Sequence, residues 1–93
     1  MEMRPTATTP GTMTVGVRLF ARYSEVSGTE HVSLLLPVGA TVADAVDEVR
    51  ARIPNGNLLP QRPLTAVNLE HVRGDHRLSD GDELALLPPL AGG

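Results

Sequence analysis

The most constraining feature of the sequence is a single apolar stripe with helical spacing in residues 42–53. Its members recur at offsets of 0, 3, 4, 7 and 11, the pattern of a helix that buries one side. Thr41 and Asp44 form a helix-start signature related to the capping box, and Pro54 and Gly56 end the pattern. The residues predicted to be buried are Val42, Ala45, Val46, Val49 and Ile53. Such a helix needs another element to cover its stripe.

Strand patterns lie on both sides of this helix. Apolar residues alternate with others in residues 15–22, which is typical of a half-buried strand. The remaining predicted strands are 31–36, 64–68, 70–72 and 83–87. Residues 24–29 contain Gly28 and are predicted to be a turn, which makes the first two strands a hairpin.

The order of elements predicts the fold. The first and last strands are the most apolar, so we expect them side by side and parallel at the centre of the sheet, with the helix across one face. This arrangement is an α+β, β-grasp fold with a mixed sheet of four to five strands. Residues 15–87 form the predicted domain. Residues 1–14 lack periodicity and are predicted to be a disordered leader, with Met13 as an alternative start to Met1.

Composition excludes several classes of function. The chain has no cysteine, so it has no disulfide, thiolate metal site or catalytic cysteine. A net charge of −3 and only two aromatic residues argue against nucleic acid as a partner. The three histidines, His31, His71 and His76, match no zinc spacing, so we expect no metal and no bound cofactor. No stretch resembles a signal peptide or membrane span, and we expect a cytoplasmic protein that binds no membrane.

The last six residues, 88–93, are predicted to be a flexible tail with a reactive end. Pro88 and Pro89 cannot donate sheet hydrogen bonds, so they end the last strand and stiffen the exit of the chain. Gly92 and Gly93 carry no side chain and can enter a channel too narrow for other residues. We interpret the unhindered carboxylate of Gly93 as the chemically modified group. The alternative is an inert, frayed end.

An apolar surface is predicted beside this tail. If the helix covers the face that carries Val15 and Val17, then Phe20, Leu35 and Leu87 lie on the opposite, open face. An aromatic residue and two leucines on an open face are a candidate partner surface, and scattered surface hydrophobics are the alternative. We expect one partner to contact this surface together with tail residues Pro88, Pro89, Leu90, Ala91 and Gly92.

Several segments resemble the small, sulfur-carrying subunit of molybdopterin synthase, a member of the MoaD/ThiS-like, ubiquitin-like sulfur carriers. The similar segments are Val17-Arg18-Leu19-Phe20-Ala21, Ala66-Val67-Asn68, and Asp80-Gly81-Asp82-Glu83-Leu84 running on to Pro88-Pro89 and the final Gly92-Gly93. The resemblance covers residues 15–93, and the double proline favours the molybdopterin carrier over the thiamine carrier.

The resemblance implies a carrier without catalytic side chains of its own. An ATP-dependent, ubiquitin-activating-type adenylyltransferase would adenylate Gly93, and a sulfur donor enzyme of the desulfurase or rhodanese type would convert it to a thiocarboxylate. The tail would then enter the large subunit of molybdopterin synthase, where its sulfur builds the dithiolene of the molybdenum cofactor. The implied partners are therefore these three proteins.

Two alternatives stay open. Ala91 stands where the family often has Ser or Thr, and it resembles the tail of a related carrier for cysteine synthesis. The chain is then a sulfur carrier for cysteine, thiamine or tRNA thiolation. The second alternative is a ubiquitin-like interaction module that binds through Phe20, Leu35 and Leu87 and has an inert tail. Conjugation to other proteins is a question that the sequence leaves open.

Overall fold

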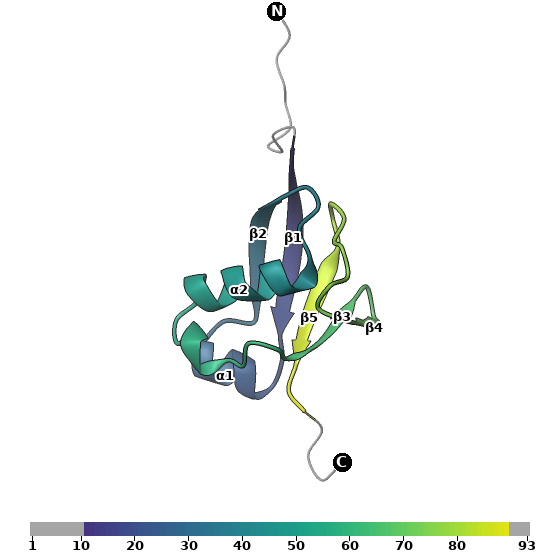
Figure 1. Cartoon of the computed structure of the whole chain (residues 1–93). Coiled ribbons are helices and arrows are strands. Elements are labelled where there is room, and N and C mark those ends of the chain that lie inside the picture. Colours follow the sequence, from purple (N-terminus) through teal and green to yellow (C-terminus); the bar gives the residue numbers. More distant parts are fainter. Residues whose placement is uncertain (1–10, 90–93) are drawn as a thin grey trace, which may run out of the picture.

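The computed structural model describes residues 11–89, in which a main helix crosses one face of a five-stranded mixed sheet (Figure 1). The elements are β1 (Thr12–Leu19), α1 (Arg22–Ser27), β2 (His31–Pro37), α2 (Val42–Arg52), the short helix η1 (Gly56–Leu58), β3 (Leu64–Val67), β4 (Glu70–Val72) and β5 (Glu83–Leu87). No helix within residues 11–89 is both long enough and apolar enough to cross a membrane.

The strand order is β2-β1-β5-β3-β4, and β5 is the central strand. β1 and β5 are parallel, whereas β1–β2, β3–β5 and β3–β4 are antiparallel. The sequence-based prediction of a β-grasp with the first and last strands adjacent and parallel is therefore confirmed. Because the two strands are parallel, β1 begins at one end of the sheet and β5 finishes at the other (Figure 1).

β1 begins earlier than the sequence pattern predicted. The leader was expected to extend to residue 14, but the strand starts at Thr12. Met13 is buried opposite Leu36 on β2, so it extends the alternating apolar series by one member. The backbone N–H of Thr14 donates a hydrogen bond to the carboxylate of Asp80 at 2.7 Å, which fixes the start of the strand to the loop before β5.

α2 forms as its sequence predicts. Thr41 Oγ1 accepts a hydrogen bond from the Asp44 N–H at 3.2 Å, and Asp44 Oδ2 accepts one from the Thr41 N–H at 2.9 Å, which completes a capping box. The five residues of the apolar stripe are all buried. The next N–H groups of the helix are also paired, because Val42 donates to the carbonyl of His76 and Ala43 to that of Gly74, both at 2.9 Å.

The six-residue helix α1 overlaps residues 24–29, which were predicted to be a turn, and it includes Arg22, which was predicted to lie in the first strand. Ala21, with φ 50°, turns the chain out of β1, and Gly28, with φ 71°, is the left-handed residue that ends the helix. The helix buries Tyr23 in the core, and this burial raises the pKa of its hydroxyl. Gly28 therefore does change the direction of the chain, as predicted, but it does so at the end of a helix.

The segment after α2 packs closely against it at Gly56. A Cβ atom on this residue would lie 2.2 Å from the carbonyl oxygen of Arg50, so no side chain fits. Arg50 Nε donates to the carbonyl of Leu59 at 2.9 Å, and Leu59 is buried in the core. η1 is thus held under the end of α2, and the chain is directed from there into β3.

Candidate functional site at the root of the C-terminal tail

The central strand β5 leads directly to the C-terminal tail. Its last residue, Leu87, is paired with Leu64 on β3, and the preceding Leu86 lies between Leu19 on β1 and Thr65 on β3. Pro88 and Pro89 follow outside the strand, the first half-buried and the second exposed. Because neither proline can donate a hydrogen bond to a neighbouring strand, the sheet ends here, as the sequence predicted.

Three apolar residues lie near the point where the chain leaves the sheet. Phe20 directly follows the last β1–β5 pair, which places it beside Leu87, and Leu87 is paired with Leu64. Each of the three is next in the chain to a buried residue of a strand. Because successive side chains of a strand point to opposite faces, the three lie on the face opposite α2. Phe20 is 39% exposed, Leu64 is 47% exposed and Leu87 is half-buried. We call Phe20, Leu64 and Leu87 the tail-root patch.

Leu35 does not lie beside Phe20 and Leu87, so its predicted position near the tail is wrong, while its role in partner binding stays a prediction. Leu35 does lie on the open face and is 52% exposed. However, it is paired with Thr14, which lies six residues before Phe20 on β1. At about 3.3 Å per residue, this separation is roughly 20 Å. The alternation of the strand gave the correct face, but it carried no information on position along the sheet.

Leu64 is the member of the patch that sequence reasoning missed. β3 was predicted, but its pairing with β5 was not. The antiparallel register joins Leu64 to Leu87 and Ala66 to Ala85, so β3 adds one leucine and one small residue to the open face. The sequence offered no signal for this pairing beyond an apolar residue at the start of the strand.

A charged cluster lies further from the tail on the same face. Glu83 Oε2 accepts a hydrogen bond from Arg18 Nε at 3.1 Å and lies 3.4 Å from His31 Nε2. A Cβ on Gly16 would lie 2.8 Å from Glu83 Oε1, so the missing side chain lets Glu83 reach across β1. These exposed pairs stabilise the fold by about 1 kcal/mol or less, and they bound the apolar end of the face.

The other sequence-predicted residues fall into two groups. His31 and His71 lie on β2 and β4, and His76 lies in the loop before β5. Among the residues that the structure describes, no group of three histidine or acidic side chains is placed to hold a metal ion. Leu90, Ala91, Gly92 and Gly93 lie outside residues 11–89, so their predicted roles stay predictions.

One main helix on a mixed sheet, with the first and last strands adjacent and parallel, defines a ubiquitin-like β-grasp protein. The model of the ThiS family matches residues 17–93. The chain belongs to this family, as the sequence segments had indicated.

The similar proteins cover most of the chain. A protein of Chlamydomonas reinhardtii, named molybdopterin synthase sulfur carrier subunit, is 35% identical over 83 residues, which are 87% of this chain and 100% of that protein. The crystal structure of SAMP1 from Haloferax volcanii has a TM-score of 0.72 and 31% identity, and the match covers 86% of this chain and 99% of that one. A chain in the BexX/CysO complex of Amycolatopsis orientalis has a TM-score of 0.65 and 27% identity, with coverage of 85% and 99%.

Proposed function

We propose that this chain is the sulfur carrier subunit of a molybdopterin synthase and that Gly93 carries the sulfur. The observation that carries the proposal is the central strand β5, which ends at Pro88 and Pro89 beside the tail-root patch, in a sequence whose last two residues are Gly92 and Gly93. The name and full-length match of the Chlamydomonas reinhardtii protein support the choice of pathway.

The proposed chemistry takes place at the C-terminal carboxylate. Attack of this carboxylate on ATP gives an acyl adenylate and releases pyrophosphate. Hydrosulfide released by a donor enzyme then attacks the acyl carbon, a C–S bond forms as the bond to AMP breaks, and the products are AMP, a proton and a thiocarboxylate on Gly93. A thiocarboxylate is ionised at neutral pH and is a soft nucleophile, so it needs no general base from this chain. The chain is therefore a co-substrate, and the catalytic side chains belong to the partner proteins.

The described residues would present this end to the partners. β5 is paired on both sides, so the tail starts from the most firmly held strand of the sheet. The prolines direct the chain away from the sheet, and the tail-root patch offers apolar area next to the exit. We infer that the large synthase subunit and the adenylyltransferase both contact this patch while they hold the tail, in the cytoplasm.

A carrier for another pathway is the second candidate. Ala91 is the residue that favours it, together with the likeness to a chain of the BexX/CysO complex. In that case the same carboxylate chemistry would supply sulfur for cysteine, thiamine or tRNA thiolation. An interaction module with an inert tail is the remaining alternative, and it requires no chemistry at Gly93.

Intact mass spectrometry tests the carboxylate chemistry. After incubation with the adenylyltransferase, ATP and a sulfur donor, the chain should gain about 16 Da, because one oxygen is replaced by sulfur. Deleting Gly93 should abolish the gain and leave the urea unfolding curve unchanged. A wild-type chain that gains no mass, or a shortened chain that still delivers sulfur, would contradict the proposal.

Reconstitution then distinguishes the pathways. The charged chain, the large subunit of the same organism and the cyclic pyranopterin precursor should together give molybdopterin. A chain that becomes charged but yields no molybdopterin in this assay would be a carrier for another pathway. A chain that is never charged would fit only the interaction module.

A further inference from the structure

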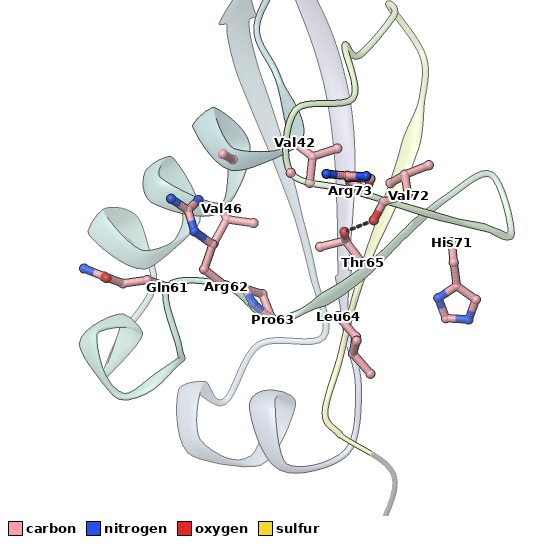
Figure 2. Close-up of a pocket in the computed structure, with 12 residues that line it drawn as sticks. Val42, Val46, Gln61, Arg62, Pro63, Leu64, Thr65, His71, Val72 and Arg73 are labelled. Carbon is pink, nitrogen blue, oxygen red and sulfur yellow. Dashed lines mark hydrogen bonds between the residues drawn. The ribbon is translucent and has the colours of Figure 1, made fainter.

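A second surface feature lies between the start of α2, the start of β3 and the loop after β4. It is a pocket of about 320 Å³, which is within the size range of small ligand sites. Figure 2 shows the valines of α2 and β4 facing the same space. We call it the α2–β4 pocket, and the residues that define it here are Val42, Val46, Leu64, Val72, Arg62 and Arg73.

The floor of the pocket is apolar, and the one side-chain hydroxyl that faces it is already hydrogen-bonded. Val42 and Val46 are buried members of the α2 stripe, and Val72 is half-buried and packed against the core. The hydroxyl of Thr65 also faces the pocket, but it already donates a hydrogen bond to the carbonyl of Val72 at 3.0 Å (Figure 2). The floor therefore suits an aliphatic or aromatic group.

The rim is positively charged. In Figure 2, the Arg73 side chain lies beside Val42 and Val72, and Arg62 extends towards α2. Neither guanidinium group has an ion-pair or hydrogen-bond partner among residues 11–89. No acidic residue lines the pocket; Asp75 borders an adjoining hollow that both arginines share, but it forms no ion pair with them. In a chain of net charge −3, this is a local concentration of positive charge.

The walls of the pocket are held together by the backbone. The hydrogen bonds from Val42 to His76 and from Ala43 to Gly74 join the first turn of α2 to the loop that carries Arg73. This loop follows β4, which is paired with β3 through Thr65 and Val72. These hydrogen bonds hold the apolar floor and the loop in place, so ligand binding would not carry the entropy cost of ordering them.

We propose that the α2–β4 pocket is a docking site for a partner protein segment in which an aliphatic or aromatic side chain stands next to a carboxylate. The apolar group fills the valine-lined floor, and the carboxylate pairs with Arg62 and Arg73, since guanidinium groups bind carboxylates in bidentate geometry. Leu64 lines this pocket and its side chain also belongs to the tail-root patch, so the two surfaces adjoin at the start of β3 although they lie on opposite faces of the sheet. One partner can therefore hold the tail and extend over the β3 end of the sheet; this part rests on the proposed function.

A titration with a small probe tests the chemistry of the pocket. N-acetyl-leucine combines an aliphatic side chain with a carboxylate, and N-acetyl-leucinamide is its neutral counterpart. The acid should give saturable NMR shifts at the amides of Val46 and Val72, and the amide should not. The double variant Arg62→Gln and Arg73→Gln should lose these shifts, whereas Arg22→Gln, which removes an exposed arginine of α1, should keep them. Equal shifts from both probes, shifts in the double variant, or no shifts at all would overturn the proposal.

Binding to the large synthase subunit tests the choice of partner. The double variant should bind about tenfold more weakly than wild type at low salt, and the difference should shrink as salt is added, because exposed charge pairs are screened. Arg22→Gln should bind like wild type. If wild type gains sulfur and binds, and the double variant binds equally well, the docking proposal fails and the sulfur carrier function stands. If wild type is neither charged nor bound, the proposed function fails, and the NMR titration still decides whether the pocket takes a carboxylate.

Discussion

The face of the sheet that α2 covers is uniform, whereas the open face changes in character from one end to the other. On the covered face, β1 and β5 contribute only buried aliphatic side chains, such as Val15, Val17, Leu84 and Leu86. On the open face, the tail end is apolar, the alanine pair follows, and a charged cluster lies beyond it. The same strands supply both faces, because successive side chains point to opposite sides.

Within a single strand, alternate residues therefore serve different purposes: one set stabilises the fold, and the other is available for partner binding. Residues on the covered face contribute their buried area to folding, and few substitutions there are neutral. Residues on the open face contribute little to folding, so the choice of side chains there can be determined by partner binding. Folding therefore does not explain why the residues at the tail end of the open face are apolar.

The largest expected effect comes from neighbouring leucines on opposite faces. Leu86→Ala should lower the free energy of unfolding by about 2–5 kcal/mol, because Leu86 is fully buried and the substitution leaves a cavity. Leu87→Ala should lower it by about 1 kcal/mol or less, since this side chain is half-buried. Urea unfolding followed by circular dichroism measures both. Equal losses would show that the open face is as important for stability as the covered face.

A smaller effect should appear when the two ends of the open face are compared. Phe20→Ser should weaken binding of the large subunit by about 2 kcal/mol, as expected for an aromatic residue in a partner-contact surface. Leu35→Ser is the matched control, because this leucine is also exposed on the open face but lies at the far end. Isothermal titration calorimetry gives both affinities. If Leu35→Ser weakens binding as much, the contact surface extends along the whole face.

The smallest effect concerns the one titratable side chain in the core cluster, Tyr23. Its pKa in the folded protein is raised by burial, so the stability that depends on its protonated form is fully present below the unfolded pKa of about 10 and is lost as the pH rises through the folded pKa. Tyr23→Phe should flatten the fall in stability as the pH rises above about 10. The chain has one tyrosine and no lysine, so few other groups titrate in this range. An identical fall in both proteins would contradict this assignment.

Much of the fold could be predicted because its signals are local. The α2 stripe, its capping box and the alternation in β1 and β5 each follow from a few adjacent residues. α1 could not be predicted in this way. It has only six residues, too few for a clear helical period, and Ser24 and Gly28 within and after it are also typical of turns.

The candidate site depended on information that the sequence does not carry. Phe20 and Leu87 were correctly assigned to the open face by alternation alone. Whether Leu35 or Leu64 lies beside them depends on strand register, and register is set by pairing between segments that are far apart in the chain. The α2–β4 pocket has the same origin, because Val42 and Arg73 come together only through the loop contacts of His76 and Gly74.

The position of β5 also has a mechanical consequence. A partner that draws the chain end into a narrow channel would pull along the axis of this strand. Its hydrogen bonds to β1 and β3 run across that axis, so they would be loaded together in shear and could not open one at a time. The domain should therefore withstand traction at its C-terminal end without losing the pairing of its central strand.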